Sequence, residues 1–361
     1  MEINHHQSDI NNQETFNLNE LKCIIDDQTG NLLKIPFCNY ERNMTLLRCL
    51  LYAKKANKIL VGTNHGLYIC NPTTFLMENA LNPASTDGWF YDRINCTDSY
   101  FLLERRDGTI LTSSQNGKIK IYDLLKLECI KEIIIDLQIY GKVQDGAELN
   151  NGDLIVLFGN DILIYDGNSY EMIKKIEEYK SRVYAVCFMK DYKFITASYD
   201  DSRLIFWRKD SNNYIKEHCI NDIKICGQKN MIFNEDKNVL IIGFENTISI
   251  IDGNKYNVIK TIDTGKNRIT HIKCLLLLKE GFFIAAKSNG EIVEYDNQYN
   301  LHSQIEKVNE FYHPLLYSIT DVIYFNNCLF IACGTHSIKI FKKSNEKTKI
   351  SKYVRSDYDS D

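Results

Sequence analysis

Seven copies of one strand pattern, their regular spacing and a composition rich in β-forming residues predict an all-β chain folded as a seven-bladed β-propeller of four-stranded antiparallel blades. The clearest part of the pattern is an apolar run followed by a polar or acidic residue. Its copies end at positions 71, 123, 166, 208, 252, 296 and 342. The spacings of 52, 43, 42, 44, 44 and 46 residues agree with a blade period of about 40–45 residues.

Each repeat also contains a second apolar strand, which precedes the first by a tight turn. These preceding strands cover residues 59–62, 110–113, 154–157, 194–197, 240–243, 283–286 and 330–333. Turns such as Asn116-Gly117 and Asn289-Gly290 separate the two strands, and these residue types tolerate the backbone of a tight hairpin. One meander cannot bury both of its faces, so neighbouring repeats must stack, and closure into a ring protects the edges.

Ring closure predicts a role for the N-terminal part of the chain. The last repeat, 320–341, supplies three strands, and residues 26–35 have the pattern of a turn followed by a strand. We therefore expect this N-terminal strand to complete the last blade. Residues 21–25 form a further strand-like run, which is either a fifth strand or an edge extension. Polar composition predicts disordered tails at 1–19 and 344–361 around a propeller at 20–343.

Composition favours a soluble protein of average charge. Lys plus Arg number 43 and Asp plus Glu 47, so the net charge of −4 gives no support for nucleic acid or anionic membrane as a partner. No apolar run approaches the length of a membrane span, and the N-terminus has no signal-peptide pattern. The 12 Cys include no CxxC pair and read as small apolar core residues in a reducing compartment, cytoplasmic or nuclear.

The repeat at 183–207 resembles a WD40 repeat, because it joins a Ser-x-Asp-Asp turn to a strand that ends in Trp. The resemblance implies that Ser198, Asp200 or Asp201, and Trp207 belong to the structural hydrogen-bond network of the blade. Period and strand order extend it over residues 21–342. The Gly-His pair of the family is missing, and Trp closes only one of the seven strands, so the chain is similar to a divergent member. The first repeat, 59–69, is also similar to citron-homology propellers.

Candidate binding residues lie in the connections between the outer strand of one blade and the inner strand of the next. The longest connection accounts for the 52-residue spacing and contains Trp89, Phe90, Tyr91 and Arg93. Trp, Tyr and Arg are enriched at the energetic centres of protein interfaces, so this loop is a partner-binding candidate. The alternative is that Trp89 and Phe90 fold back over the blade edges.

Four further residues occupy equivalent positions in other blades. Phe311 and Tyr312 stand before the last repeat, where the alternative is that Pro314 and the aromatic residues shape a turn. Arg182 and Arg268 stand just before inner strands and are either partner contacts or ordinary surface charges. These four complete the set of expected partner-binding residues.

Motifs for catalysis are weak, and the sequence predicts neither an enzyme, a cofactor nor a metal. Thr264-Gly265-Lys266 lacks the full phosphate-loop pattern, and the eight His form no zinc motif. The predicted function is a WD-repeat scaffold that binds other proteins or peptides on its loop face, in a multiprotein complex. One alternative is a substrate receptor of a ubiquitin-ligase assembly. Another is an enzyme or small-ligand sensor, which predicts acidic, His or Arg side chains converging in the central channel.

Overall fold

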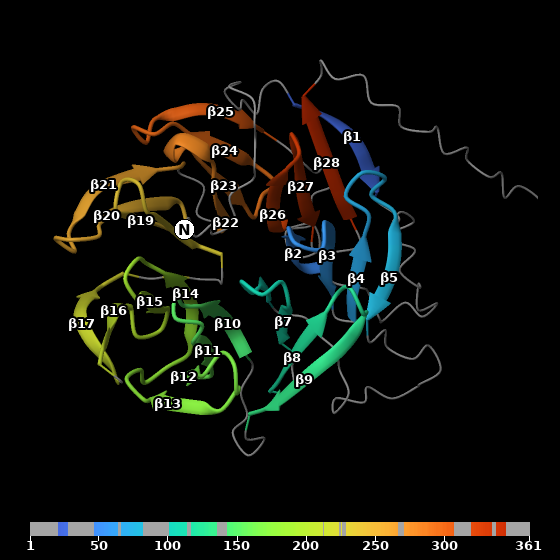
Figure 1. Cartoon of the computed structure of the whole chain (residues 1–361). Coiled ribbons are helices and arrows are strands. Elements are labelled where there is room, and N and C mark those ends of the chain that lie inside the picture. The colour runs from blue at the N-terminus through green and yellow to red at the C-terminus, as the bar shows by residue number, and fades with distance from the viewer. Residues whose placement is uncertain are drawn as a thin grey trace, which may run out of the picture.

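The computed structural model describes residues 21–27, 47–63, 66–81, 101–113, 117–135, 143–211, 213–223, 225, 229–265, 271–306, 319–333 and 337–343, with the backbone alone at 21–27, 337 and 343. Seven four-stranded antiparallel sheets stand as blades around a central axis (Figure 1). Within these ranges the one helical element is a single 3₁₀ turn, η2 (Lys279–Gly281). The predicted all-β propeller with seven blades is confirmed.

Each blade is a meander whose first strand lies at the axis and whose fourth strand lies at the rim. Blade 1 comprises β2 (Leu47–Ala53), β3 (Lys58–Thr63), β4 (Gly66–Cys70) and β5 (Met77–Leu81), and blade 2 comprises β6 (Leu102–Glu104), β7 (Ile110–Ser113), β8 (Lys118–Asp123) and β9 (Glu128–Ile134). Blade 3 comprises β10 (Val143–Glu148), β11 (Leu154–Phe158), β12 (Asp161–Tyr165) and β13 (Met172–Ile176), and blade 4 comprises β14 (Val183–Phe188), β15 (Lys193–Ser198), β16 (Arg203–Asp210) and β17 (Asn213–Asn221).

The remaining three blades follow the same order. Blade 5 comprises β18 (Met231–Asn234), β19 (Val239–Phe244), β20 (Thr247–Asp252) and β21 (Val258–Asp263), and blade 6 comprises β22 (Ile272–Leu277), β23 (Phe283–Lys287), β24 (Ile292–Tyr295) and β25 (Leu301–Ile305). Blade 7 comprises β26 (Ile319–Phe325), β27 (Cys328–Cys333), β28 (Ser337–Lys343) and β1 (Leu21–Asp27).

The N-terminal strand completes the last blade, as predicted, but it is a different strand from the one expected. β1 pairs antiparallel with β28, in a register that places Leu21 opposite Lys343 and Asp27 opposite Ile338. The closing strand is therefore 21–27, which also answers the question left open about residues 21–25. Residues 28–35 lie outside the described residues.

Second and third strands are rich in buried apolar residues because both of their faces are covered by neighbouring blades. Every residue of β11 and β12 is buried, whereas β9 at the rim buries one residue of seven. The buried side chains form seven hydrophobic clusters, and each cluster fills the seam between two adjacent blades. The core is thus a ring of seven seams, which explains why apolar strands repeat along the whole chain.

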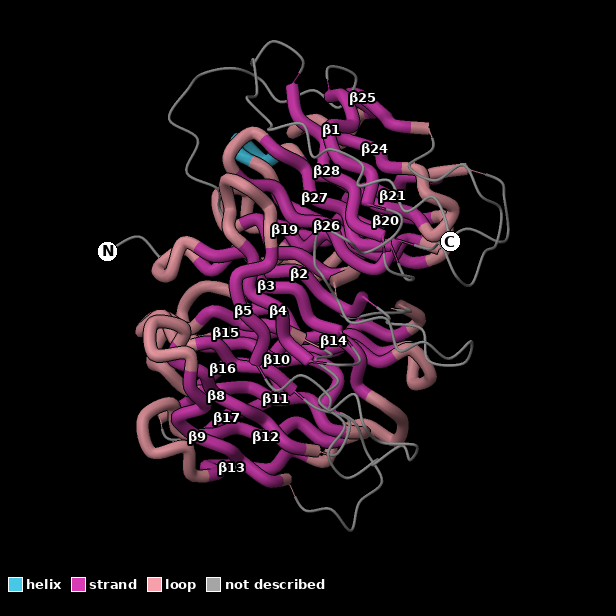
Figure 2. Tube along the Cα trace, turned by 90° about the vertical axis from the view of Figure 1, so that its right-hand side faces the viewer, coloured by secondary structure: helices cyan, strands magenta, loops and turns pink. Residues whose placement is uncertain are grey.

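The ring has two different ends. One end, here called the loop face, carries the connections from each fourth strand to the next first strand and the turns between second and third strands. The opposite end, the turn face, carries the turns between first and second strands and between third and fourth strands. η2 lies in the turn between β22 and β23, the first and second strands of blade 6, and marks the turn face in Figure 2. Among the described residues no helix is long and apolar enough to cross a membrane.

Candidate functional site

Residues 177–182 connect β13 to β14 on the loop face, and side chains from the neighbouring turn hold their backbone in place. Asp201 Oδ2 accepts the backbone N–H groups of Lys180 at 2.7 Å and Ser181 at 3.3 Å. Ser198 Oγ donates to the carbonyl of Arg182 at 2.7 Å. This short loop is therefore ordered by the turn between β15 and β16 before any partner arrives.

A second group of hydrogen bonds lies directly beneath the loop, inside blade 4. Trp207 Nε1 donates to Thr196 Oγ1 at 2.7 Å, and the Tyr179 hydroxyl lies 2.8 Å from the same oxygen. Tyr179 also donates to the Thr196 carbonyl at 2.9 Å. All three side chains are buried, so each bond replaces one that water would otherwise supply. Burial also raises the pKa of the Tyr179 hydroxyl far above its ordinary value, which keeps it protonated.

The residues expected to form one blade network thus divide between two groups. Trp207 bonds Thr196 and lies over Phe194, with ring centroids 6.0 Å apart. Ser198 and Asp201 bond the loop instead, and Asp201 rather than Asp200 caps its N–H groups.

Two basic side chains project from the ordered loop. Lys180 and Arg182 are both exposed, while Tyr179 between blade 3 and blade 4 is 4 % exposed. Of the predicted partner-binding residues, Arg182 is the one that the structure describes. The others lie outside the described residues: Trp89, Phe90, Tyr91, Arg93, Arg268, Phe311 and Tyr312.

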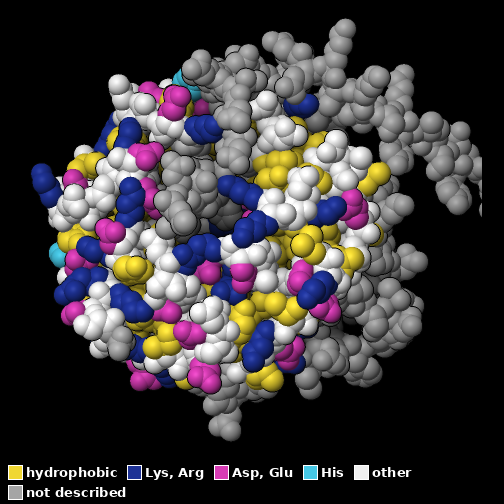
Figure 3. Space-filling view, viewed as in Figure 1, with side chains coloured by type: hydrophobic (Ala, Val, Ile, Leu, Met, Phe, Trp, Pro, Cys, Tyr) yellow, Lys and Arg dark blue, Asp and Glu magenta, His cyan; other side chains and the backbone are white. Residues whose placement is uncertain are grey.

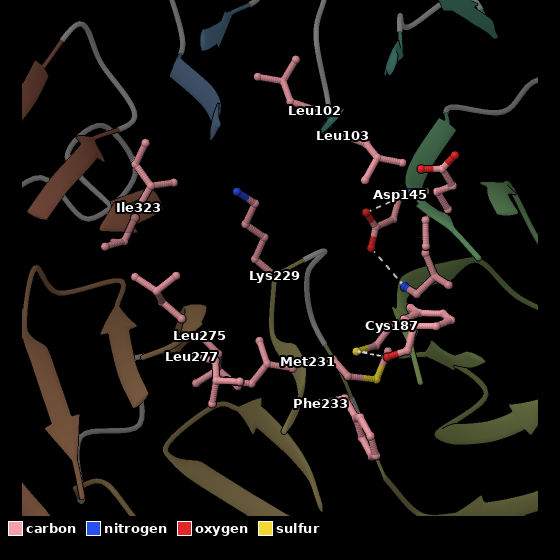
Figure 4. Close-up of a pocket in the computed structure, with 18 of the residues that line it drawn as sticks. Leu102, Leu103, Asp145, Cys187, Lys229, Met231, Phe233, Leu275, Leu277 and Ile323 are labelled. Atoms are coloured by element: carbon pink, nitrogen blue, oxygen red, sulfur yellow. Dashed lines mark hydrogen bonds between the residues drawn. The ribbon is translucent and has the colours of Figure 1, made fainter. Parts of the chain in front are cut away.

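The first strands of all seven blades line a cavity of about 230 Å³ on the axis. Its wall is mostly apolar and includes Leu103, Val186, Met231, Phe233, Leu277 and Ile323. Lys229 extends into the cavity, and Asp145 faces it from another wall (Figure 4). The lining continues to Lys54 and Glu148, beside the turn-face ends of β2 and β10. Figure 3 shows the turn face, with basic and acidic side chains around its centre.

Asp145 occupies the point where β10 has a β-bulge, and its carboxylate joins two blades. Oδ2 accepts the N–H of Val186 in blade 4 at 3.0 Å, and Oδ1 accepts the N–H of Gly146 at 2.9 Å. Burial raises the pKa of this carboxyl group to about 7, although both N–H bonds and the charge of Lys229 lower it. A carboxyl group with this pKa exchanges its proton near neutral pH.

Asp321 occupies the equivalent bulge of β26 and repeats the same contact at another seam. Its Oδ2 accepts the N–H of Leu50 in blade 1 at 2.5 Å, and the Lys229 ammonium group lies 2.5 Å from the same oxygen. Lys229 also donates to the Leu50 carbonyl at 3.1 Å. One lysine from blade 5 thereby contacts both blade 7 and blade 1, and its charge is compensated by Asp321, which is 1 % exposed.

Possible metal ligands and cysteine thiols are the other chemically relevant groups of the described residues. Within the described ranges, no group of three or more His, Cys, Asp or Glu side chains is placed to hold a metal ion. Burial raises the pKa of the Cys49 and Cys187 thiols to about 12, so neither is a thiolate at neutral pH. The described channel lining contains no His or Arg.

Sequence reasoning missed Asp145, Lys229 and Asp321, although a signal for the two acids was present. Each stands two residues after an apolar residue that opens an inner strand, Val143 or Ile319. A charged residue at the same offset in two repeats indicates a shared structural position. Lys229 has no such counterpart, because its role depends on blades that lie far away in the sequence.

A comparison with known families finds one match. Residues 170–208 match the family model described as WD domain, G-beta repeat. This segment runs from Tyr170, in the turn before β13, to Arg208 within β16, and contains both hydrogen-bond groups of blade 4. No curated protein matches the chain.

Proposed function

We propose that this seven-bladed β-propeller, in which residues 170–208 match a WD-repeat model, is a non-catalytic platform that binds other proteins on its loop face. WD40 propellers generally act as protein-interaction scaffolds. A rigid ring of blades suits this role because it holds several loops in fixed relative positions without taking part in chemistry. We place the protein in the cytoplasm, as a member of a multiprotein complex.

The ordered loop at 177–182 is the observation that carries the proposal. Its backbone is fixed by two N–H groups that donate to the Asp201 carboxylate and by one carbonyl that accepts a hydrogen bond from Ser198. Its side chains Lys180 and Arg182 nevertheless remain exposed. A loop whose backbone is already fixed loses little conformational entropy when a partner binds, so its contacts contribute more fully to affinity.

Charge indicates what kind of partner segment this loop would bind. Lys180 and Arg182 lie two positions apart on one short loop and are both cationic. Arg offers a fork of N–H donors that matches a carboxylate, so an acidic peptide segment is the complementary partner. The aromatic candidates Trp89, Phe90 and Tyr91, on the connection from blade 1 to blade 2, would supply the apolar part of the same proposed surface.

Affinity purification of the tagged full-length chain from its native cells tests this function. The loop-face variants are Lys180→Ala with Arg182→Ala, and Trp89→Ala with Tyr91→Ala and Arg93→Ala. The matched control is Lys126→Ala with Lys255→Ala, which removes two exposed lysines from the turn face. Circular dichroism first establishes that every variant is folded.

The expected result is a set of stoichiometric partners that the control retains and at least one loop-face variant loses. Partners retained by every variant would move the binding surface elsewhere. Recovery of no stoichiometric partner would overturn the platform function. Ubiquitin-ligase subunits among the partners would identify the platform as a substrate receptor.

A further inference from the structure

The central channel has the composition of a ligand site and not of a closed core. Its cavity of about 230 Å³ exceeds the roughly 150 Å³ that accommodates a benzene molecule in an engineered protein cavity. Its walls are apolar side chains from the inner strands, including Leu103, Met231 and Phe233. Asp145 and Lys229 are partly buried residues inside the ring.

The two charged groups differ in the hydrogen-bond and ion-pair partners that they already have. The Lys229 ammonium group already contacts a carboxylate, Asp321, and the carbonyl of Leu50. Among the described residues, Asp145 accepts hydrogen bonds from backbone N–H groups alone, one on each oxygen. An ionised carboxylate has about four acceptor positions, so Asp145 retains capacity for further donors.

The pairing of charges around the cavity, and not their sum, gives the sign of the preferred ligand. Lys229 forms an ion pair with Asp321, whereas Asp145 forms no ion pair among the described residues. At the turn-face rim, Glu148 is paired with Arg105 and Arg106, and Lys54 adds one positive charge to the lining. An added cation beside Asp145 would neutralise the one carboxylate in the cavity that has no side-chain counter-ion among the described residues.

We propose that the central channel binds a small amphipathic amine, whose ammonium group faces Asp145 and whose apolar body of about ten heavy atoms packs against the channel wall. The ligand is a primary or secondary amine, because two or more N–H donors can reach the free acceptor positions of the carboxylate. An anionic ligand is disfavoured, since Lys229 is occupied by Asp321 and Asp145 would repel the added charge.

Calorimetric titration of the full chain with three probes of one shape tests the proposal. The probes are phenethylamine, 2-phenylethanol and 3-phenylpropionate, which carry a cationic, a neutral and an anionic end on the same ring. We expect phenethylamine to bind at least about tenfold more tightly than the alcohol, because a charge-assisted bond is stronger than a neutral one. We expect the carboxylate to bind most weakly.

Two variants locate the site. Asp145→Asn keeps an acceptor oxygen for Val186 but removes the charge, and should bring the affinity for phenethylamine to within about twofold of that for the alcohol. Asp210→Asn makes the same change in charge on the exposed outer hairpin of blade 4 and should leave all three affinities unchanged. Thermal denaturation checks that both variants fold.

Four results would overturn the proposal. Tightest binding of 3-phenylpropionate would assign the channel to anions through Lys229. Equal binding of amine and alcohol would leave an apolar cavity with no role for charge. Amine binding that survives in Asp145→Asn would place the amine at another site, and no amine binding at millimolar concentrations would mean that the channel has no amine site. Since partner binding on the loop face is measured separately, none of these outcomes alters the test of the platform function.

Discussion

Single carboxylates on the inner strands join neighbouring blades by hydrogen bonds. For Asp145, the contribution to the free energy of unfolding depends on pH. Its pKa is about 7 in the folded protein, against an ordinary value of 3.8. Between these pH values the folded protein binds more protons than the unfolded chain. The free energy of unfolding contributed by Asp145 is therefore greatest below about pH 4 and is lost as pH rises through 7.

Asp145→Asn should remove this dependence. We expect the melting temperature of the variant to exceed that of the wild type at about pH 8, with the difference shrinking toward pH 5, because only the wild type must ionise a buried carboxyl group. Scanning calorimetry of both proteins across this range measures the difference. A variant that is destabilised equally at every pH would show instead that hydrogen bonding to Val186 and Gly146 outweighs the burial of charge.

Thr196 is the shared acceptor of the buried network in blade 4, so its loss should be measurable. Thr196→Val keeps the side-chain shape but leaves Trp207 Nε1–H without its acceptor, and should lower the free energy of unfolding by about 1–3 kcal/mol. Urea denaturation gives this value. In combination with Trp207→Phe, which removes the orphaned donor, the loss should be smaller than the sum of the two single losses. Strict additivity would mean that the bond between Thr196 and Trp207 contributes nothing.

Some residues of the two hydrogen-bond groups of blade 4 were accessible from the sequence, but their bonding was not. Ser198 and Trp207 stand where the resemblance to a WD40 repeat implies members of a structural hydrogen-bond network, whereas Thr196 and Tyr179 were not predicted. The register of β15 against β16, however, sets Trp207 opposite Phe194, and Thr196 is then its diagonal neighbour. Tyr179 reaches the same oxygen from the preceding connection. Register and loop path are properties of pairing, and spacing along the chain does not fix them.

Hairpins between third and fourth strands form a repeated element on the turn face. In Asp166–Tyr170 and Asp252–Tyr256, the Asp side chain accepts two backbone N–H groups of the turn, and the Tyr has a φ near +60°. This backbone directs the aromatic ring back onto the preceding blade. Tyr170 contacts Arg105 of blade 2, and Tyr256 lies against Phe206 of blade 4. The hairpin therefore closes a seam as well as a blade.

Arg105 is the centre of one such seam and is 5 % exposed. It donates to the Tyr170 hydroxyl at 2.6 Å and the Gly167 carbonyl at 2.7 Å, and lies 3.4 Å from Glu148. Arg105→Met should lower the free energy of unfolding by about 3–5 kcal/mol, because it leaves buried Glu148 with a weaker counter-ion. Arg208→Met, which removes an exposed arginine, should cost less than about 1 kcal/mol. Similar losses in the two variants would exclude a special role for the seam.

The strands that the sequence located best are those buried on both faces. The second and third strands are rich in apolar residues, with β11 and β12 apolar almost throughout, and the sequence located all seven pairs. The closing strand was assigned to the wrong run, because 21–25 and 32–35 have similar apolar content and only pairing with β28 distinguishes them. The channel residues escaped notice for the same reason, since Lys229 meets Asp321 only once the ring has formed.

On the scale of the whole molecule, stability depends on closing a ring of seven seams. Six blades are built from consecutive strands, but blade 7 takes its fourth strand, β1, from the other end of the sequence. β1 covers the outer edge of β28, which would otherwise present unpaired N–H and C=O groups along seven residues. Lys229 adds a second closure by contacting blades 7 and 1 from blade 5.

Removal of β1 should therefore affect the entire propeller. We expect a chain lacking residues 1–27 either to unfold without one cooperative transition or to associate through the exposed edge of β28. The reason is that an unpaired strand edge is a template for strand pairing. A chain lacking residues 1–20 retains β1 and should keep the melting temperature of the full chain, as expected if residues 1–19 are a tail. Calorimetry and sedimentation of the three chains compare them directly. If the shorter truncation destabilises as much as the longer one, residues before Leu21 take part in the fold; if neither does, closure by β1 contributes little to stability.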